Sequence, residues 1–567
     1  MKQKITNIIQ KVISGMLTSP LDFSVDISND KSHGDYSTNA ALILAKKIGK
    51  KPFEAANLIK EKIGENSLFK KVEVAGPGFI NFFISDKVLI DNLKNIDKDF
   101  GKGTEMENKR IIVDFTDTNL FKEFHIGHLM SNTVGEALSR IFESRGAKVK
   151  RICYQSDVGL NIAKAIYGME NLDQDYNKIS ATKNVSAKAA FLGSAYAYGS
   201  QAYEQNQEAK EAIIKINKEV YDKSNTITNK FYKVGKKWSL ESFGEIYKKL
   251  GTKFDEFIFE SQVFDSGKNI VKNGLEKGIF EKGDNGAIIF KGEKYGLHTR
   301  VFINSEGLPT YEAKDLGLAE FKYKKYKHDS SIIITANEQN EYFKVMLCAM
   351  DKMMPELAEK TKHMGHGMLR LPEGKMSSRT GKVITGESLI EKVEELVKEK
   401  IKNREFLDKE REKIAEEVAV GAIKYSILKQ SIGSDIIYDF DKSISFEGDS
   451  GPYLQYSYAR AESILRKAKN EKIRPSFKKV PAELSELEKD LYHFPEIVLE
   501  AQRKYEPHYL VTYLTDLAGK FNSYYAHNKI VVKVDEFSPY RIALTKAFAQ
   551  VMKNGMRMLG IKSLEKM

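Results

Sequence analysis

The stretch Arg110-Ile111-Ile112-Val113-Asp114-Phe115, followed by His125-Ile126-Gly127-His128, decides the fold of this chain. The first six residues predict a buried strand, and residues 129–142 carry apolar side chains at the spacing of a helix. A helix that begins at the second motif directs free backbone N–H groups and the positive end of its dipole beyond the strand, which suits a phosphate. The two imidazoles add donors for phosphate oxygens, and Gly127 between them leaves room for a flat base.

A second motif, Lys375-Met376-Ser377-Ser378-Arg379, lies far downstream beside Gly381 and predicts a cationic loop that can clamp a triphosphate. Each motif alone has an ordinary interpretation, because a His-x-x-His pair is often a surface or metal pair and basic loops that contain serine are common. The two motifs in this order resemble the signature of class I aminoacyl-tRNA synthetases. A zinc site would need more ligands than the histidines, and Cys153 and Cys348 cannot supply the set, so we expect no zinc or other protein-bound metal.

Composition limits the class of protein. At 567 residues the chain is too long for one core and predicts about three or four domains. Its 90 basic and 78 acidic residues give a formal charge of +12, which favours polyanionic partners without proving one. Two distant cysteines indicate a reducing compartment without a disulfide framework. Because no apolar run approaches membrane-spanning length and the first residues predict an amphipathic helix rather than a signal peptide, we expect a cytoplasmic protein with no membrane partner.

Three domains are predicted along the chain. Residues 1–103 predict a small α+β domain that contains a hairpin around Gly76-Pro77-Gly78. Residues 104–388 alternate strands and helices, as the parallel sheet of a Rossmann-type α/β domain requires, with a helical insertion near 172–240. Residues 389–567 predict an all-α bundle, helical throughout. Within the middle domain, strand signals after the first strand lie at 148–154, 287–290, 301–303 and 331–335.

Longer segments resemble the arginyl-tRNA synthetases over essentially the whole chain. HGDYSTNAALILAKKIGKKPFEAA near the N-terminus is similar to that family's additional domain, which in relatives touches the tRNA elbow. EIYKKLGTKFDEFIFES, GLPTYEAKD and ANEQNEYF are similar to its catalytic core. FEGDSGPYLQYSYARAESILRKA and the terminal KNGMRMLGIKSLEKM are similar to its helical anticodon-binding bundle, often called the DALR domain. Several separated segments in the family's order are more specific than either short motif.

The resemblance implies an enzyme that condenses ATP and L-arginine to arginyl-adenylate and then transfers arginine to tRNA(Arg), releasing pyrophosphate and AMP. Mg²⁺ is implied as the ion carried with ATP. Because adenylation is an in-line displacement at the α-phosphate, catalysis is mostly positioning and electrostatic stabilisation. The implied catalytic residues are His125 and His128, which donate to phosphate oxygens, and Lys375, which holds the departing pyrophosphate. The implied ATP-binding residues are these three with Gly127, Met376, Ser377, Ser378 and Arg379.

A substrate guanidinium requires carboxylates and other acceptors in a partly desolvated site. The resemblance places Asp114, Tyr311 and Asp315 around it, and Asn119 and Gln339 at the α-amino and carboxylate end. The sequence gives some independent support, because Tyr311 and Asp315 share a face if their segment is helical, and Asp114 ends a strand of an open sheet. Asp315 could instead cap the helix or pair in the neighbourhood of Lys314, and Tyr311 could belong to the core.

Two departures from the family pattern affect these roles. The family commonly has Ser-Ser-Pro-Asn where this chain has Thr116-Asp117-Thr118-Asn119, so Asp117 either joins the arginine site or caps the helix. A lysine common in class I enzymes is Ser378 here, as in many arginine enzymes. Its charge would then come from Arg379 or Lys382.

RNA contact is expected to be electrostatic first, with stacking groups beside it. The residues expected to bind tRNA are Tyr36, Asn39, Tyr453, Gln455, Tyr456, Arg460 and Arg466. Basic residues on helices are also typical of solvated surfaces, so the surface as a whole is a firmer expectation than any one residue. We expect a monomer.

Three other classes of protein would be expected to differ from this sequence in specific features. A class I synthetase for cysteine would be expected to bring zinc-binding thiolates. A non-catalytic tRNA-binding relative would be expected to lack the histidine motif or Lys375. A nucleotidyltransferase with the same sheet would lack the long helical tail.

Overall fold

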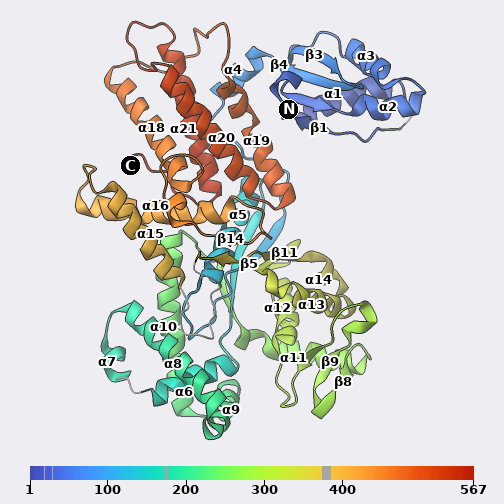
Figure 1. Cartoon of the computed structure of the whole chain (residues 1–567). Helices are drawn as coiled ribbons and strands as arrows, with labels where there is room; N and C mark the ends of the chain where they lie inside the picture. Colours follow the sequence, from blue (N-terminus) through green and yellow to red (C-terminus); the bar gives the residue numbers. More distant parts are fainter. Residues whose placement is uncertain (18, 29, 173–175, 373–384) are drawn as a thin grey trace. The chain divides into compact units, whose positions relative to one another are not determined.

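The computed structural model describes residues 1–17, 19–28, 30–172, 176–372 and 385–567 (Figure 1). The chain divides into two compact units. The first contains residues 1–100, 461–494 and 520–551, and the second contains residues 101–460, 495–519 and 552–567. Four C-terminal helices contribute residues to both units: α18 (Gly451–Asn470), α19 (Glu486–Lys504), α20 (His508–His527) and α21 (Ser538–Met558). The domain boundaries at residues 103 and 388 stay a prediction.

A five-stranded parallel sheet forms the centre of the second unit. In spatial order its strands are β12 (Thr361–His366), β11 (Ser330–Ala336), β5 (Arg110–Phe115), β6 (Lys148–Gln155) and β7 (Glu256–Phe259). Strand β5, the first strand of this sheet along the chain, lies in the middle, and residues 111–115 are buried, as the four apolar side chains around Asp114 predict. In such sheets ligands bind beyond the carboxyl ends of the strands, where the strand order reverses. Here that point lies between β5 and β11.

Helix α5 (Ile126–Ser144) follows β5 and is buried along most of its length. Gly135 lets it pack closely on the strand, because a Cβ atom there would come within 2.2 Å of Phe115 Cγ. The start of α5 is thereby fixed beyond the carboxyl end of β5, as the sequence predicts.

Two expected strands do not belong to the parallel sheet. Strands β9 (Ile288–Phe290) and β10 (Arg300–Ile303) pair antiparallel with each other, and β9 also pairs with β8 (Glu281–Lys282). The physical reason is the short connection between β9 and β10, which cannot hold the crossover helix that a parallel pair needs. The parallel sheet is instead completed by β7 and β12, which the sequence did not predict.

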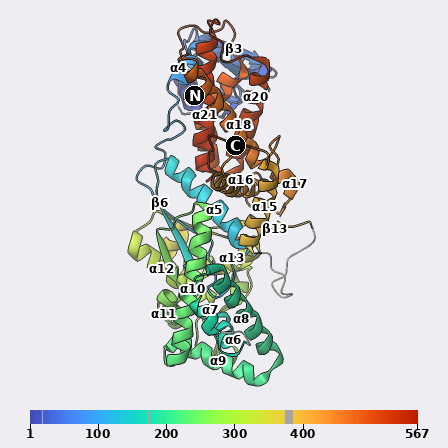
Figure 2. The same ribbon diagram turned by 90° about the vertical axis from the view of Figure 1, so that its left-hand side faces the viewer.

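Helices surround the sheet and form the insertion in the second unit. The insertion contains α6 (Leu160–Asn171), α7 (Tyr176–Ala181), α8 (Val185–Gln205), α9 (Gln207–Asp222) and α10 (Thr226–Leu250). Asn184, Asn206 and Asn225 cap α8, α9 and α10 by accepting backbone N–H groups, and α6, α8, α9 and α10 pack together (Figure 2). The other helices are α11 (Glu260–Glu276), α12 (Tyr311–Tyr326), α13 (Asn340–Met353), α14 (Pro355–Lys360), α15 (Gly386–Ile401), α16 (Asp408–Leu428) and α17 (Phe440–Ser443).

One strand interrupts the helices that the sequence predicts after residue 390. Strand β14 (Ile436–Ile437) pairs in parallel with β13 (Leu369–Arg370), which precedes the segment of the second motif. Short 3-10 helices complete the connections at η1 (Lys31–His33), η2 (Asp284–Gly286), η3 (Gly292–Tyr295) and η4 (Asn337–Gln339).

The first unit contains an antiparallel sheet in the order β1 (Val25–Ile27), β2 (Tyr36–Thr38), β4 (Phe79–Ile84) and β3 (Phe69–Ala75). The helices α1 (Lys2–Ser14), α2 (Ala40–Ile48), α3 (Pro52–Ile63) and α4 (Asp86–Lys94) belong to the same unit. The apolar stripe of α1 is buried through Ile5, Ile9 and Ile13, which accounts for its helical spacing. In the part of the chain that the structure describes, every helix is too short or too polar to span a membrane.

Candidate active site

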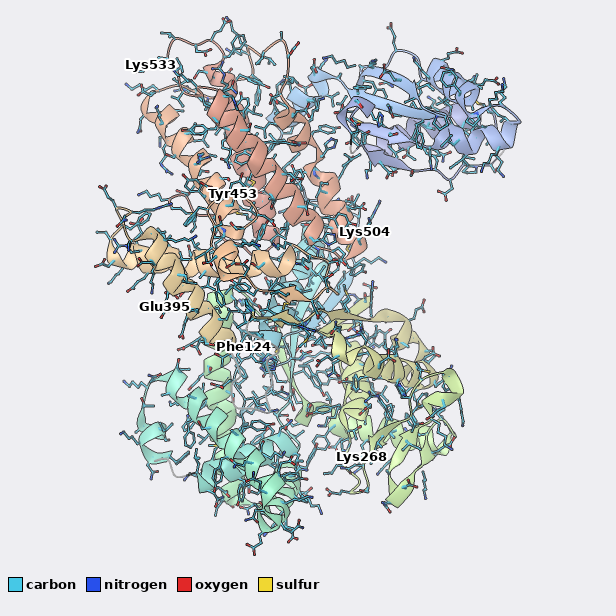
Figure 3. All side chains as sticks on the ribbon, in the orientation of Figure 1. Phe124, Lys268, Glu395, Tyr453, Lys504 and Lys533 are labelled. Atoms are coloured by element: carbon cyan, nitrogen blue, oxygen red, sulfur yellow. The ribbon has the colours of Figure 1, made fainter. Side chains whose placement is uncertain are left out.

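The first histidine motif forms a closed hydrogen-bonded turn at the start of α5, which we call the histidine turn (residues 125–128). His125 is the N-cap: the His128 backbone N–H donates to its Nδ1 at 3.4 Å, and its own N–H donates to His128 Nδ1 at 3.3 Å. The two rings stack with their centres 3.6 Å apart. Phe124, labelled in Figure 3, lies against the His128 ring. Two backbone donors of the helix end are thus satisfied by the histidines themselves.

Both imidazoles are neutral. Burial, with the nearby positive charge of Lys122, lowers the pKa of His125 to about 4 and that of His128 well below its usual value. Because each Nδ1 accepts a backbone N–H, the single ring proton of each neutral imidazole is on Nε2. The histidine turn therefore presents two Nε2–H donors without a full positive charge, an arrangement suited to a phosphate whose charge increases during reaction.

The second motif falls outside the described residues. Lys375, Met376, Ser377, Ser378 and Arg379 all belong to the segment 373–384, for which no structure is given. The residues that follow this segment are bonded to the histidine turn. His125 pairs with Thr385 in an antiparallel bridge, and the Gly386 N–H donates to the Phe124 carbonyl at 2.6 Å. The chain that carries the second motif therefore re-enters the described structure next to the first motif.

The connection from β5 to α5 has unusual backbone geometry. Thr116, Asp117 and Phe121 all have positive φ, at 80°, 44° and 64°, which side chains other than glycine rarely adopt. The fold holds Thr116 in place, because its N–H donates to Ser131 Oγ at 2.9 Å and its hydroxyl accepts from Asn132 Nδ2 at 3.0 Å. Such strain is typical of functional loops, and here it directs Asp117 and Asn119 across the ends of the strands.

One of the two carboxylate oxygens of Asp114, at the end of β5, is paired with a lysine. Asp114 is 1% exposed, and its Oδ2 accepts from Lys322 Nζ of α12 at 2.8 Å, in an ion pair buried on both sides. Its other oxygen, Oδ1, is buried and has no hydrogen-bond partner among the described residues. A buried carboxylate oxygen without a donor is costly, so this atom is open to a ligand that carries one.

Asp315 lies on α12 and has no cationic partner in the described ranges. Its Oδ2 accepts from the Tyr342 hydroxyl at 2.6 Å. Burial is the main reason that its pKa rises to about 7, with the charges of Glu260 and Asp114 adding to the effect. Tyr311 is one helical turn away on the same helix, with half of its side chain exposed, which fits the predicted shared face.

Three further carboxylates complete what we call the carboxylate cluster: Asp114, Asp117, Asp157, Glu260 and Asp315. Glu260 pairs with Lys314 at 2.7 Å, and Asp157 pairs with Lys236 at 2.8 Å. Asp117 accepts from the Tyr154 backbone N–H at 3.1 Å, and burial together with Asp114 raises its pKa well above the usual value. Three lysines thus neutralise three members, and among the described residues the other two, Asp117 and Asp315, have no cationic partner. Asp117 joins the cluster rather than capping α5, whose cap is His125.

Sequence reasoning missed Asp157, Glu260 and Lys322. Asp157 comes shortly after β6, and Glu260 directly after β7, so the rule that marks Asp114 at a strand end also marks them. No local sequence pattern identifies Lys322 as a site residue, because its partner Asp114 is more than 200 residues away.

Asn119 and Gln339 follow the two central strands. Asn119 forms a parallel bridge with Ser156, and Gln339 ends η4 after β11 with its side chain exposed. Both therefore lie beyond the carboxyl edge of the sheet, where the carboxylate cluster also lies.

Two of the residues expected to bind RNA are corrected by their burial. Tyr36 is fully buried in the first unit, with its hydroxyl 3.1 Å from His493 Nδ1, and Gln455 is fully buried in the second unit. Gln455 Nε2 donates to the backbone carbonyls of Glu417 and Lys562 at 3.2 and 2.9 Å. Both side chains support the interior and present no surface to RNA.

The other RNA-binding expectations lie on partly or fully exposed positions. In the first unit Asn39 precedes α2 and accepts from the Ser24 N–H at 2.9 Å, and Arg466 is exposed on α18. In the second unit Tyr453, Tyr456 and Arg460 lie on α18. The Arg460 guanidinium lies 4.8 Å from the centre of the Tyr456 ring.

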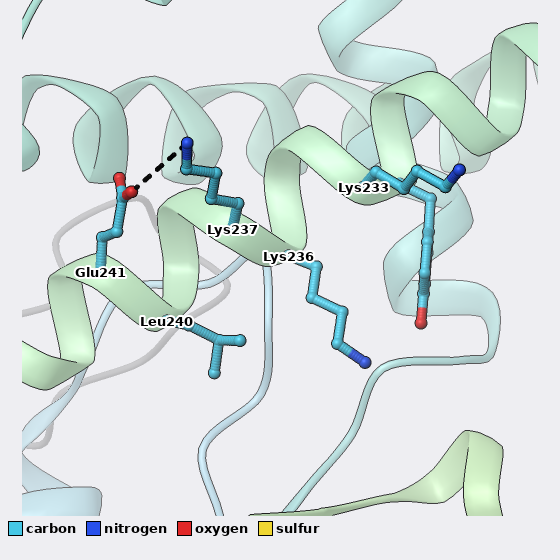
Figure 4. A pocket seen from close by; sticks show the side chains of 6 residues that line it. Lys233, Lys236, Lys237, Leu240 and Glu241 are labelled. Carbon is cyan, nitrogen blue, oxygen red and sulfur yellow. Dashed lines mark ion pairs between the residues drawn. The ribbon is translucent and has the colours of Figure 1, made fainter.

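A hollow of about 480 Å³ lies along α10, away from most of these residues (Figure 4). Its lining consists of Tyr232, Lys233, Lys236, Lys237, Leu240 and Glu241. It adjoins the carboxylate cluster through Asp157, which accepts from the Tyr232 hydroxyl and from Lys236 Nζ. In the described ranges, no group of three or more His, Cys, Asp or Glu side chains could hold a metal ion.

Comparisons with known proteins cover the whole chain. Residues 90–440 match the family model "tRNA synthetases class I (R), catalytic domain", residues 454–567 match "DALR anticodon binding domain", and residues 1–84 match "Arginyl tRNA synthetase N terminal domain". An arginine–tRNA ligase of Fusobacterium nucleatum is 32% identical over 100% of this chain and 99% of its own length. An arginine–tRNA ligase of Borreliella burgdorferi is 33% identical over 93% and 92%. The Thermus thermophilus arginyl-tRNA synthetase structure has a TM-score of 0.81 at 23% identity and covers both chains fully, which confirms the predicted fold class.

Proposed function

Because the chain belongs to the arginyl-tRNA synthetase family of class I aminoacyl-tRNA synthetases, we propose that it attaches L-arginine to tRNA(Arg) through arginyl-adenylate. ATP enters as its magnesium complex, and pyrophosphate and AMP leave. The observation that carries the choice of amino acid is the carboxylate cluster, in which Asp315 has no lysine partner among the described residues and lies near the histidine turn's edge of the sheet. A guanidinium is the side chain that such a surplus of buried negative charge selects.

The histidine turn acts on the phosphates in this proposal. Its two Nε2–H groups donate to oxygens of the α-phosphate region, where negative charge builds up as the arginine carboxylate attacks. The free N–H groups at the start of α5 support the same charge. Lys375 and the remaining residues of the second motif hold the departing pyrophosphate, and Gly127 leaves space for the nucleoside.

The carboxylate cluster orients arginine. Asp315 and Asp114 Oδ1 accept from the guanidinium, with Tyr311 beside them, and Asn119 and Gln339 bind the α-amino and carboxylate end. This arrangement holds the arginine carboxylate toward the histidine turn, so much of the rate gain comes from positioning.

Binding of tRNA is assigned to the surfaces that carry Asn39, Tyr453, Tyr456, Arg460 and Arg466. The positive formal charge of +12 supports a polyanionic partner. A monomer that works in the cytoplasm is part of the proposal.

Pyrophosphate exchange tests the proposal when it is measured with each amino acid in turn, with and without tRNA(Arg). Arginine should stimulate exchange. Stimulation by cysteine or glutamate, with none by arginine, would overturn the proposed specificity.

A further inference from the structure

Tyr154 lies at the carboxyl end of β6, on the sheet face that α11 and α12 cover. Its ring packs against a buried cluster that includes Ile152, Ile258 and Leu318. Its backbone N–H donates to Asp117 Oδ1 at 3.1 Å. The ring is therefore held by packing on one side, and the strand directs its hydroxyl toward the carboxylate cluster.

The Tyr154 hydroxyl is buried and has no hydrogen-bond partner among the residues that the structure describes. Burial raises the pKa of Tyr154 well above its usual value, and the negative charges of Glu260, Asp315, Asp114 and Asp157 raise it further. The hydroxyl stays protonated at any physiological pH. Buried tyrosine hydroxyls usually find a partner, so an unsatisfied one among carboxylates needs an explanation.

Asp114 provides a second, independent observation. Its Oδ1 is also buried and has no hydrogen-bond partner in the described part of the chain, although Oδ2 is bonded to Lys322. The lysines of the cluster are already committed to Asp114, Glu260 and Asp157. A ligand that carries several N–H groups would serve both unsatisfied atoms at once.

We propose that the Tyr154 hydroxyl is a binding group for the substrate guanidinium and sets part of the specificity for it. The phenolic oxygen accepts an N–H of the guanidinium, and the phenolic hydrogen is donated to a carboxylate oxygen of the cluster. A neutral acceptor fits here because a further carboxylate would add repulsion to Asp315, whose pKa is already raised to about 7 by burial and by the charges of Glu260 and Asp114. This inference rests on the proposed function and names one more contact of the same site.

A tyrosine that served only packing would behave differently. In that case phenylalanine would replace it with no effect on any substrate, because the ring carries all the packing. In the proposed role, Tyr154→Phe loses one hydrogen bond to a charged group, which weakens arginine binding roughly 10- to 100-fold. Since no described residue of the free protein is hydrogen-bonded to the hydroxyl, its removal should leave the thermal midpoint unchanged or raise it.

The experiment compares Tyr154→Phe with wild type by pyrophosphate exchange in the presence of tRNA(Arg) and by thermal unfolding with and without arginine. The expected result is an arginine KM raised roughly 10- to 100-fold, an unchanged KM for ATP, an unchanged kcat and a smaller thermal shift on adding arginine. The matched control is Tyr540→Phe, whose buried hydroxyl donates to Glu488 Oε1 at 2.6 Å in the first unit. The control should lower the thermal midpoint and leave the arginine KM unchanged.

Other outcomes would overturn either the role of Tyr154 or the proposed function, and the measurements distinguish the two. An unchanged arginine KM in Tyr154→Phe, or equal changes in the KM for ATP and arginine, would overturn the role of Tyr154 and leave the proposed function intact. A lowered thermal midpoint in the free variant would show that the hydroxyl is structural. Absence of arginine-dependent exchange in wild type would overturn the proposed function together with this contact.

Discussion

The histidine turn and the carboxylate cluster lie beyond the same edge of one sheet, yet they are built in opposite ways. In the histidine turn, both rings are neutral, and each Nδ1 is bonded within four consecutive residues. In the carboxylate cluster, charges from four separate segments are buried together, and three of the five carboxylates have lysine partners among the described residues. An anion can be held by oriented dipoles that cost little to keep in place, whereas selection of a cation requires a surplus of buried negative charge.

Replacing Lys322 by methionine tests how much the buried ion pair between Lys322 and Asp114 contributes to stability. The change leaves Asp114 buried without its cation and should lower the free energy of unfolding by about 3–5 kcal/mol. Denaturant unfolding followed by the fluorescence of Trp238, the single tryptophan, reports on the second unit. Lys324→Met on the same helix is the control, since its pair with Glu320 is solvent-exposed and its loss should cost under about 1 kcal/mol. Equal losses in the free energy of unfolding would show that the buried pair stabilises the fold no more than the exposed pair does.

His128→Ala tests the histidine turn. It removes one phosphate donor and should lower the rate of arginine activation about 100- to 1000-fold, with a much smaller loss of ATP affinity. Single-turnover adenylation and ATP calorimetry separate the two quantities. His328→Ala is the control, because this histidine is also buried but precedes β11 at the opposite edge of the sheet. Matching losses of rate and ATP affinity in His128→Ala would indicate ground-state binding only.

Asp315→Asn tests whether the surplus charge binds the substrate. Losing a hydrogen bond between two charged groups, worth about 1.5–3 kcal/mol, should raise the arginine KM roughly 10- to 100-fold. The KM for ATP should stay within about twofold of wild type, since the histidine turn is unchanged. Normal arginine dependence in this variant would mean that Asp315 has a structural role.

The two regions should also differ in their response to pH. A guanidinium binds the ionised form of Asp315, whose pKa in the free protein is about 7. As the pH falls below 7, a proton must leave before arginine binds, so the arginine KM should rise about tenfold per pH unit. The histidines, with the pKa of His125 near 4, should not titrate between pH 6 and 8, so kcat at saturating arginine should stay flat. An arginine KM that is constant from pH 8 to pH 6 would contradict the assignment of the pKa to a substrate-binding group.

The histidine turn could be predicted from the sequence, whereas the ion pairs of the carboxylate cluster could not. The strand at residues 110–115, the helix after it and the histidine pair are local patterns, and the structure places them as predicted. Family membership and fold class were predictable because several long segments resemble one family, and the comparisons confirm both. The pairs Asp114–Lys322 and Glu260–Lys314 were not predictable, because each joins distant segments that only the folded sheet brings together.

Local sequence patterns also did not predict which side chains are buried. Tyr36 and Gln455 belong to segments that resemble RNA-binding domains, yet their side chains are bonded inside the protein. The strands at 287–290 and 301–303 were recognisable as strands, but the sheet to which they belong depends on the length of their connection. The residues of the second motif lie outside the described structure, so their role in holding pyrophosphate stays a prediction.

The most direct test of the account is the number of protons released when arginine binds, measured by calorimetry at pH 7 in buffers of different ionisation enthalpy. In the presence of tRNA(Arg), wild type should release about half a proton per arginine, because the Asp315 carboxyl, with a pKa of about 7, is half protonated before binding and ionised after it. Asp315→Asn should lack this contribution. Equal proton release by the two proteins would contradict the claim that the buried Asp315 carboxyl, which has no cationic partner among the described residues, selects the guanidinium.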